Sequence, residues 1–507
     1  MFDSELCLPS ALASAIENAA AMPAFLDGTR TNTWGEVGER IQRLAAGLHD
    51  LGIRQGTRVA IVARTTFRAE EIKWAILWLG AVAVPLNWRY SGAELQHALT
   101  DSEPSLIVAD EASSELLREV KREFLILGKD TEQLIAGSQP RPADLCDERS
   151  DAMLFYTGGT TGRSKGVRLT HRNIYLNALQ IASCLRPLRS DVYLHAAPNF
   201  HTVSLLATCF LMRGSSNAYL PAFDPGGVLD AIERYRVTVM TAVPTMVIQM
   251  VRDPSFEGRD LSSLRLLLFG GEAFSADWIA HLDRVLPNVD LVHGYGLTET
   301  SPNISLLEPE LVRDAMHGRR GKEILRACGK PHMGASVRIV DDEGHELPSG
   351  EAGEVLFRGP GLMASYLNLP VETAAAIRDG WLHTGDIGKL DAEGNLYILD
   401  RLKDMIITGG ENVYSVEVER ALTSHEDVVE AAVFGLPDPT YGEMVTAAVM
   451  IKSGASADAD SLQEHCRALI ARYKAPRRIE VVADFPRTPI GKVNKKALRN
   501  AYLKEDR

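Results

Sequence analysis

The sequence of 507 residues exceeds the length at which one hydrophobic core keeps growing, and its composition, 45% hydrophobic and 24% charged, is typical of a folded globular protein rather than a disordered or fibrous one. Its formal net charge of -13 disfavours nucleic acid as the main partner, because clustered Lys and Arg are what bind phosphate backbones. The most apolar stretch, residues 74–86, is shorter than the roughly 18 residues of a membrane span and therefore predicts buried core.

The N-terminal residues indicate a cytoplasmic protein, and the cysteines indicate neither a zinc site nor a disulfide framework. Residues 1–5 carry acidic side chains where a secretory signal needs positive charge before an apolar run. The six cysteines lie far apart in the sequence without paired spacing, which argues against a zinc site and against a disulfide framework. We therefore expect the cysteines to be buried thiols or incidental.

Helices and short apolar strands alternate through the N-terminal half. Thr33 and Glu36 have the spacing of a helix capping box, and apolar residues then recur at helical intervals until Gly52. The same order of elements continues along the chain, with strands expected at 58–63, 82–86 and 237–243 and helices at 72–79 and 228–235. This alternation predicts α/β layers with largely parallel sheets.

The chain changes character from about Ser336 onward. Short strands are expected at 337–340, 353–357 and 396–399, with Gly and Asp turn signals between them, which indicates a small β-rich lobe. After Asp404 helix and strand patterns alternate again over about 100 residues, enough for a compact domain. We therefore predict an N-terminal domain over 1–401, a hinge at 402–403 and a C-terminal domain over 404–507.

A loop suited to polyphosphate follows one of the apolar strands. Residues 154–166 begin as a strand and become dense in Gly, Thr and Ser before Lys165. Gly lets backbone N–H groups close around an anion, Thr hydroxyls add donors, and Lys165 supplies a cation. The common P-loop is excluded because no Gly-Lys-Ser/Thr triplet closes the segment. Taken alone, the segment could also be a flexible surface turn.

This loop resembles the signature loop of the adenylate-forming superfamily, which includes acyl-CoA synthetases, adenylation domains of peptide synthetases, and luciferases. Gly158 and Ser164 depart from the residues that the family usually has in the loop, and Glu272 stands beside the expected adenine site. Further family motifs follow in order at 270–273 (GGEA), 293–300 (HGYGLTET), 380–386 (GWLHTGD), 400–404 (DRLKD), 409–414 (GGENVY) and 489–492 (PIGK). One such motif is weak evidence, but the ordered set is specific.

The resemblance implies a fold and an activity. The fold is a large multilobed N-terminal domain with a smaller, mobile α+β C-terminal domain. The activity is that of an ATP-dependent acid–CoA ligase, which activates a carboxylic acid as acyl-AMP with release of pyrophosphate and then passes the acyl group to coenzyme A with release of AMP. The substrates and cofactors implied are ATP, Mg²⁺, coenzyme A and a small carboxylic acid. From the general frequency of symmetric oligomers we expect a homodimer.

By the same resemblance, Lys492 bridges the acyl carboxylate and the α-phosphate, Glu299 holds Mg²⁺ with Thr161, and Lys165 grips the departing pyrophosphate. Asp386 accepts hydrogen bonds from the ribose hydroxyls, with Arg401 nearby as a donor. The full set of candidate ATP-binding residues is Thr157, Gly158, Gly159, Thr160, Thr161, Gly162, Lys165, Gly271, Glu272, Ala273, His293, Gly294, Tyr295, Gly296, Thr298, Asp386, Arg401 and Lys492. Tyr295 in this set is expected to stack on the adenine.

The acid and coenzyme A sites are predicted from three further segments. His201 matches a family motif that guards the acyl pocket, so we expect it to gate or contact the acid without acid–base work. The other candidate pocket residues are apolar or small, namely Val203, Gly270 and Leu297, and they favour a fatty or aryl monocarboxylate over a dicarboxylate. For coenzyme A, Lys403 matches the hinge, Gly409 and Gly410 the pantetheine tunnel, and Lys474 a phosphate contact, although a solvated charged face would explain Lys474 equally well.

Three other functions share part of this pattern. A stand-alone adenylation enzyme would load a carrier protein in trans instead of coenzyme A. A luciferase-like oxygenase would carry the same motifs but depends on a special substrate. A nucleotide-binding regulator with a dead site would have lost Lys492 or Glu299, and both are present.

Overall fold

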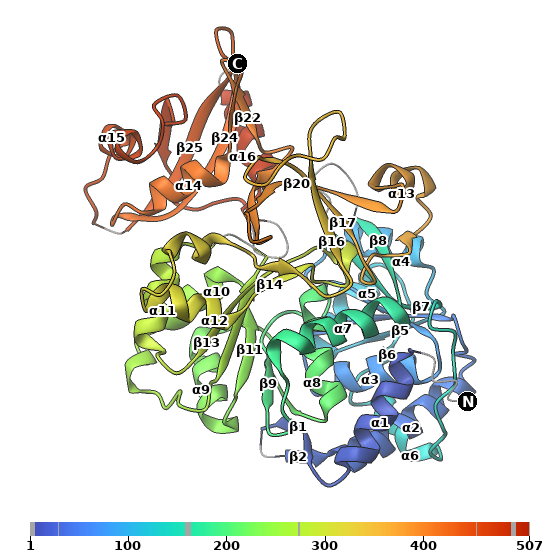
Figure 1. Cartoon of the computed structure of the whole chain (residues 1–507). Helices are drawn as coiled ribbons and strands as arrows, with labels where there is room; N and C mark the ends of the chain where they lie inside the picture. Colours follow the sequence, from blue (N-terminus) through green and yellow to red (C-terminus); the bar gives the residue numbers. More distant parts are fainter. Residues whose placement is uncertain are drawn as a thin grey trace. The chain divides into compact units, whose positions relative to one another are not determined.

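The computed structural model describes residues 6–28, 30–157, 164–271, 274–452, 454–487 and 493–505. The chain forms two compact units (Figure 1). Unit 1 consists of Met1–Ser336 and Phe357–Leu382, and unit 2 of Val337–Leu356 and His383–Arg507. In the described ranges, no helix is both long and apolar enough to cross a membrane. The β-rich residues expected after Ser336 lie largely in unit 2, and the boundary at 402–403 stays a prediction.

The larger sheet of unit 1 has a parallel middle and antiparallel edges. In the described part of the chain its order is β15 (Lys330–Pro331), β14 (Ser305–Leu307), β13 (Asp290–Tyr295), β12 (Leu266–Gly270), β11 (Val239–Ala242), β9 (Val192–His195), β10 (Ser216–Tyr219), β1 (Pro23–Asp27) and β2 (Arg30–Thr33). Strands β13 to β1 in this order run parallel, while β14, β15 and β2 are antiparallel to their neighbours. Residues 266–269 are buried throughout, as expected of a parallel strand covered on both faces.

Helices connect the parallel strands, because a parallel pair needs a crossover that returns along the face of the sheet. Helix α9 lies against β9 and α12 against β13, as Figure 1 also shows. The helices of this part of unit 1 are α7 (His171–Leu185), α8 (Thr208–Arg213), α9 (Pro225–Tyr235), α10 (Pro244–Val251), α11 (Ala276–Val285) and α12 (Pro309–Met316). The 3₁₀ turn η2 (Thr202–Ala207) follows β9, and the 3₁₀ turn η4 (Thr298–Thr300) follows β13.

The second sheet of unit 1 carries the predicted phosphate loop. Its described strands are β18 (Ser365–Tyr366), β8 (Lys165–Thr170), β7 (Asp151–Thr157), β4 (Val82–Pro85), β3 (Arg58–Val62), β5 (Leu106–Ala109) and β6 (Leu125–Ile126), in that order. The helices of this part are α1 (Leu8–Ala19), α2 (Trp34–Asp50), α3 (Phe67–Trp78), α4 (Gly92–Ser102), α5 (Ser114–Glu119), α6 (Asp130–Gly137) and α13 (Pro370–Ala376). Helix α2 begins at the predicted capping box, in which Thr33 and Glu36 exchange hydrogen bonds.

Unit 2 contains most of a group of short β-strands, together with a mixed sheet and three helices in its described residues. The first group of strands is β16 (Ser336–Val340), β17 (Gly353–Arg358), β20 (Trp381–Leu390) and β21 (Leu396–Arg401). The mixed sheet has the order β23 (Glu411–Val413), β22 (Ile406–Thr408), β25 (Gly442–Ile451) and β24 (Val428–Asp438), with β26 (Arg478–Val481) parallel to β25. Helices α14 (Ser415–Thr423), α15 (Ala459–Leu469) and α16 (Lys495–Glu505) complete it.

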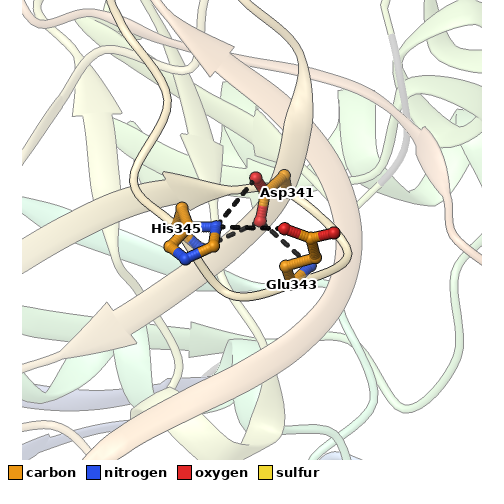
Figure 2. A group of neighbouring side chains, drawn as sticks. All are labelled: Asp341, Glu343 and His345. Carbon is orange, nitrogen blue, oxygen red and sulfur yellow. Dashed lines mark hydrogen bonds and ion pairs between the residues drawn. The ribbon is translucent and has the colours of Figure 1, made fainter.

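The turn between β16 and β17 gathers three residues that could ligate a metal (Figure 2). Here Asp341 accepts hydrogen bonds from the backbone N–H groups of Glu343 and His345, and the His345 ring lies 3.4 Å from the Asp341 carboxylate. Glu343 and His345 are exposed. A polar turn held by its own Asp accounts for this group, so we assign no site to it.

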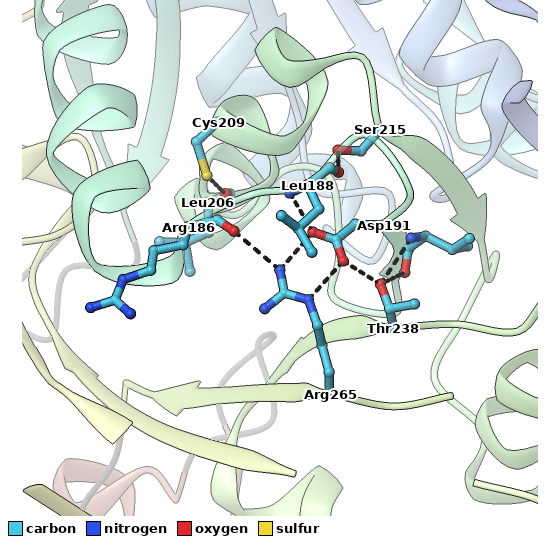
Figure 3. Close-up of polar contacts among 9 residues, drawn as sticks. Arg186, Leu188, Asp191, Leu206, Cys209, Ser215, Thr238 and Arg265 are labelled. Atoms are coloured by element: carbon cyan, nitrogen blue, oxygen red, sulfur yellow. Dashed lines mark hydrogen bonds and ion pairs between the residues drawn. The ribbon is translucent and has the colours of Figure 1, made fainter. Parts of the chain in front are cut away.

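A buried ion pair joins the amino ends of three strands of the larger sheet (Figure 3). Asp191, whose side chain is 1% exposed, accepts two hydrogen bonds from Arg265, at 2.6 and 2.7 Å. It also accepts hydrogen bonds from the Thr238 hydroxyl at 2.9 Å and the Leu188 N–H at 2.7 Å. Asp191, Thr238 and Arg265 stand just before β9, β11 and β12, so the network holds together the amino ends of these strands. Ligands of such sheets bind at the opposite, carboxyl ends of the strands.

The predicted fold class is confirmed. The chain is α/β with a large N-terminal part and a smaller C-terminal part with mixed sheets. The helix and strand positions expected from the sequence are found within a few residues, for example 58–63 as Arg58–Val62 and 228–235 as Pro225–Tyr235.

Candidate active site

The carboxyl ends of β12 and β13 bring two glycine motifs together in unit 1. The strands pair in parallel, so that Gly270 lies opposite Gly294. A Cβ atom on Gly270 would lie 2.3 Å from the Gly294 carbonyl oxygen, and one on Gly296 would lie 2.0 Å from that of Pro302, so both positions require glycine. Ligands of α/β proteins bind beyond such strand ends. Of the GGEA motif, Gly271 is described, while Glu272 and Ala273 lie outside the described residues.

The structure gives different surroundings to the two aromatic candidates on β13. His293 is buried, its ring stacks on Phe269 with centroids 5.4 Å apart, and its Nδ1 lies 3.0 Å from the carbonyl oxygen of Ala327. Tyr295 at the end of the strand is half-buried. The position of Tyr295 fits a ring that reaches a ligand, whereas the His293 ring supports the strand from the core side.

The two ends of the predicted phosphate loop lie side by side. Strands β7 and β8 are antiparallel, and Thr157 pairs with Lys165. The predicted ligand residues between them, Gly158, Gly159, Thr160, Thr161 and Gly162, lie outside the described residues. Both flanks of the loop therefore belong to one hairpin.

Lys165 and Glu299, which stand 134 positions apart in the sequence numbering, contact the same tyrosine. The Tyr366 hydroxyl donates a 2.7 Å hydrogen bond to Oε1 of Glu299. The ammonium of Lys165 lies 4.7 Å from the centroid of the Tyr366 ring. Burial, and then the Glu299 charge, raise the pKa of Tyr366 above its usual value, so its hydroxyl stays protonated at neutral pH and donates. Sequence reasoning missed Tyr366, because β18 is too short to show a pattern.

The predicted acyl-pocket segment contacts the motif that carries Glu299. His201 caps η2, and its Nδ1 accepts a 3.3 Å hydrogen bond from the Val203 N–H. The hydroxyl oxygens of Thr202 and Thr298 lie 3.3 Å apart. The segment of His201 thus lies beside the segment of Leu297, as a shared acyl pocket requires.

The two ribose candidates form a pair in unit 2. Asp386 on β20 is opposite Arg401 on β21, and Nε of Arg401 lies 2.6 Å from the Asp386 carboxylate. The Asp386 side chain is 2% exposed and that of Arg401 46% exposed. Lys403, the predicted hinge residue, lies two residues after the end of β21 and is exposed.

The coenzyme A candidates have structural roles that the sequence reasoning did not assign. Gly409 and Gly410 form the two-residue turn between β22 and β23, with φ of 61° and 83°, a turn that favours glycine at both positions. Lys474 makes two 2.8 Å contacts with the carboxylate of Glu417. A coenzyme A phosphate would therefore compete with Glu417 for this lysine.

Lys492 lies outside the described residues, but both of its flanks are held by ion pairs in unit 2. Arg487, which forms a bridge with Val493, lies 2.6 Å from Glu430. Lys495 lies 2.7 Å from Glu419. Burial lowers the pKa of Lys495, but the carboxylates of Glu419 and Asp400 outweigh it and raise that pKa, so Lys495 is charged at neutral pH.

Comparison with known proteins agrees with this arrangement. The AMP-binding enzyme family matches residues 12–367, and the AMP-binding enzyme C-terminal domain matches residues 417–492. A feruloyl-CoA synthase of an Amycolatopsis species is 38% identical, over 94% of this chain and 96% of its own length. A fatty acid–[acyl-carrier-protein] ligase, ScoC of Streptomyces coeruleorubidus, is 33% identical over 95% and 93%. The structure of o-succinylbenzoate CoA synthetase from Bacillus subtilis with its acyl-adenylate intermediate matches with a TM-score of 0.87 and 30% identity, over 97% of this chain and 98% of that one.

The chain belongs to the family of AMP-binding enzymes. The ordered motifs predict the acyl-CoA synthetase family of the adenylate-forming superfamily. The comparisons confirm this prediction.

Proposed function

We propose that this acyl-CoA synthetase activates an aryl monocarboxylic acid, with ATP as the second substrate, and transfers the acyl group from the acyl-AMP to coenzyme A. The observation that carries the adenylation chemistry is the contact of Lys165 and Glu299 with one tyrosine in unit 1. The similarity to feruloyl-CoA synthase over nearly the whole chain supports an aryl acid within the predicted range of fatty and aryl acids.

In the first half-reaction a carboxylate oxygen of the acid attacks the α-phosphorus of ATP, and pyrophosphate leaves. A carboxylate is a poor electrophile, so this step turns its oxygen into part of a good leaving group, AMP. Catalysis of such a displacement consists mainly of positioning the reactants and stabilising the phosphate charge with cations and N–H donors. We assign the leaving pyrophosphate to Lys165 and the α-phosphate to Lys492.

The residues at Glu299 fit a Mg²⁺ ion that arrives with ATP. Mg²⁺ prefers oxygen ligands, and one or two carboxylates with phosphate oxygens make a common set. Oε1 of Glu299 takes the hydrogen bond from Tyr366, while Oε2 accepts none from the described residues. When bound, Mg²⁺ would supply positive charge against the phosphate oxygens. Thr161 is the second ligand that we propose.

In unit 2 we assign the ribose to Asp386. A buried carboxylate has two acceptor oxygens for the two hydroxyls of a ribose, and the contact with Arg401 fixes the orientation of the carboxylate. The remaining ATP contacts proposed from the motifs include the Gly294–Gly296 strand end and the adenine-facing ring of Tyr295.

The second half-reaction breaks the bond between the acyl carbon and AMP, and the thiol of coenzyme A takes the acyl group. We propose that a C-terminal domain over 404–507 moves about Lys403, so that the Lys492 loop leaves and the Gly409 turn approaches. Lys474 would then exchange Glu417 for a coenzyme A phosphate. We also propose a cytoplasmic location. We further propose a homodimer, and size-exclusion chromatography with light scattering tests this oligomeric state directly.

The experiment measures AMP and pyrophosphate release from ATP and Mg²⁺ with ferulate, benzoate, octanoate, malonate and o-succinylbenzoate, each with and without coenzyme A. We expect release to depend on an aryl monocarboxylate, to rise with coenzyme A and to give a thioester. Turnover of malonate comparable to that of ferulate or benzoate would contradict the monocarboxylate assignment. Since o-succinylbenzoate has an aryl ring and two carboxylates, it separates the effect of the ring from that of the second charge.

A second function is favoured by one observation, the similarity to ScoC. A carrier-loading enzyme would release pyrophosphate with its acid at a rate indifferent to coenzyme A and would form no thioester with it. The same assay therefore decides between the two acceptors.

A further inference from the structure

One short segment of unit 1 donates backbone hydrogen bonds to Glu299 and to Gly166, the residue that follows Lys165. The Met363 N–H donates to the carbonyl oxygen of Glu299 at 2.9 Å, and the Leu367 N–H donates to that of Gly166 at 2.7 Å. Tyr366 lies between these two bonds and pairs with Val167. The backbone thus fixes where the tyrosine ring stands relative to the Glu299 segment and to the strand of Lys165.

The Tyr366 side chain contacts both charged residues, one with its hydroxyl and the other with its ring. Its hydroxyl holds one oxygen of Glu299, and its ring lies against the ammonium of Lys165. Tyr366 is 9% exposed, so water competes poorly for its hydroxyl. A ring–ammonium contact contributes about 0.5–1 kcal/mol at an exposed site and more when desolvated.

Both charged side chains gain from such support. Lys and Glu lose up to about 2 kcal/mol of rotamer entropy when they are ordered, and a site that is ordered before the substrate arrives does not spend binding energy on this step. The hydrogen bond to Oε1 also sets the orientation of the carboxylate plane, and with it the direction of Oε2. Hydrogen bonds to a ligating carboxylate commonly tune the affinity of its metal.

We propose that Tyr366 is a positioning residue for the adenylation step, which orients the Glu299 carboxylate toward Mg²⁺ with its hydroxyl and the Lys165 ammonium toward the leaving phosphates with its ring. The proposal rests on the function proposed above, in which Glu299 is a Mg²⁺ ligand. The hydroxyl and the ring act separately, so two substitutions distinguish them.

The test compares Tyr366→Phe, which removes only the hydroxyl, with Tyr366→Leu, which also removes the ring. The first readout is the dissociation constant of Mn²⁺, measured by electron paramagnetic resonance with α,β-methylene-ATP bound. The second is the Mg²⁺ dependence of acid-dependent pyrophosphate release. We expect Tyr366→Phe to weaken Mn²⁺ binding about 10-fold, with little change in the KM of ATP at saturating Mg²⁺. Tyr366→Leu should in addition raise that KM, because Lys165 loses its contact.

The matched control is Tyr156→Phe. Tyr156 lies on the hairpin that carries Lys165 and donates a 2.8 Å hydrogen bond to Asp101, so the control removes a phenol–carboxylate bond that does not involve Glu299. Its Mn²⁺ affinity should equal that of the wild type. A Tyr366→Phe enzyme that binds Mn²⁺ like the control would overturn the proposal.

Glu299→Gln separates this inference from the function on which it rests. If Glu299→Gln weakens Mn²⁺ binding and Tyr366→Phe does not, the positioning role fails and the metal assignment stands. If Glu299→Gln binds Mn²⁺ like the wild type, the metal assignment itself fails, and a positioning role through Glu299 fails with it.

Discussion

The Asp386–Arg401 pair allows the sharpest test of a single contact. Asp386→Asn keeps the size of the side chain but removes its charge and one acceptor oxygen. Because the Asp386 side chain is only 2% exposed, water cannot readily replace a lost partner. A hydrogen bond to a charged group contributes about 1.5–3 kcal/mol. If the two hydrogen bonds to the ribose do not add fully, the variant loses about 3 kcal/mol of transition-state stabilisation. At about 1.4 kcal/mol per tenfold, this loss lowers kcat/KM for ATP roughly 100-fold.

The assay compares kcat/KM for ATP and 2′-deoxy-ATP in the wild type and the variant. The wild type should prefer ATP over 2′-deoxy-ATP. This preference should fall about 10-fold in Asp386→Asn, because the variant no longer makes the hydrogen bond of about 1.5 kcal/mol to the 2′-hydroxyl. Asp391→Asn is the matched control, because Asp391 accepts backbone hydrogen bonds in a turn of the same unit. Equal losses for both nucleotides in Asp386→Asn would refute the ribose assignment.

Three further predictions concern other parts of the chain. Lys492→Ala should lose acyl-AMP formation and keep thioester formation from supplied acyl-AMP, and equal loss in both assays would contradict separate half-reactions. Asp191→Ala should lower the free energy of unfolding in urea by about 3 kcal/mol, because it leaves Arg265 without its buried partner, whereas Asp260→Ala, which breaks an exposed pair, should cost less than about 1 kcal/mol. Burial lowers the pKa of His332 to about 4, so the unfolded chain binds more protons below its usual pKa of about 6.5. Stability should therefore fall as the pH drops from about 6.5 toward 4, and His332→Gln should reduce that fall; an unchanged pH profile would refute this account.

Local signals in the sequence predicted the local structure. The capping box of Thr33 and Glu36 sets the start of α2, because both of its hydrogen bonds lie within four residues. Short buried strands such as Arg58–Val62 were likewise predicted, since continuous apolar runs between turn signals are typical of parallel sheets. These patterns do not depend on the distant chain.

Contacts between distant segments could not be predicted in the same way. The bond between Tyr366 and Glu299 depends on the pairing of the two-residue strand β18 with β8, and such a strand has no periodicity to detect. The family resemblance implies that Arg401 lies near Asp386, but their direct pairing depends on the register of β20 and β21, which the motifs alone do not give.

Some signals in the sequence indicate more than one structure. The family motif predicts that Gly409 and Gly410 line a tunnel, while their positions between two short strands also indicate the hairpin turn that the structure shows. By their contacts, most of the β-rich residues after Ser336 belong to unit 2, and the domain boundary at 402–403 stays a prediction. Which residues move together is a property of packing between segments, and a linear pattern does not contain it.

The most direct test of the central claim is acid-dependent exchange of labelled pyrophosphate into ATP in the absence of coenzyme A. Exchange requires a reversible step in which the acid displaces pyrophosphate, so it reports acyl-AMP formation without the second half-reaction. We predict exchange that requires Mg²⁺ and an aryl monocarboxylate and that gives way to thioester and AMP when coenzyme A is added. Formation of ADP and phosphate with the acid and coenzyme A, without any exchange of pyrophosphate, would contradict activation through an acyl-adenylate.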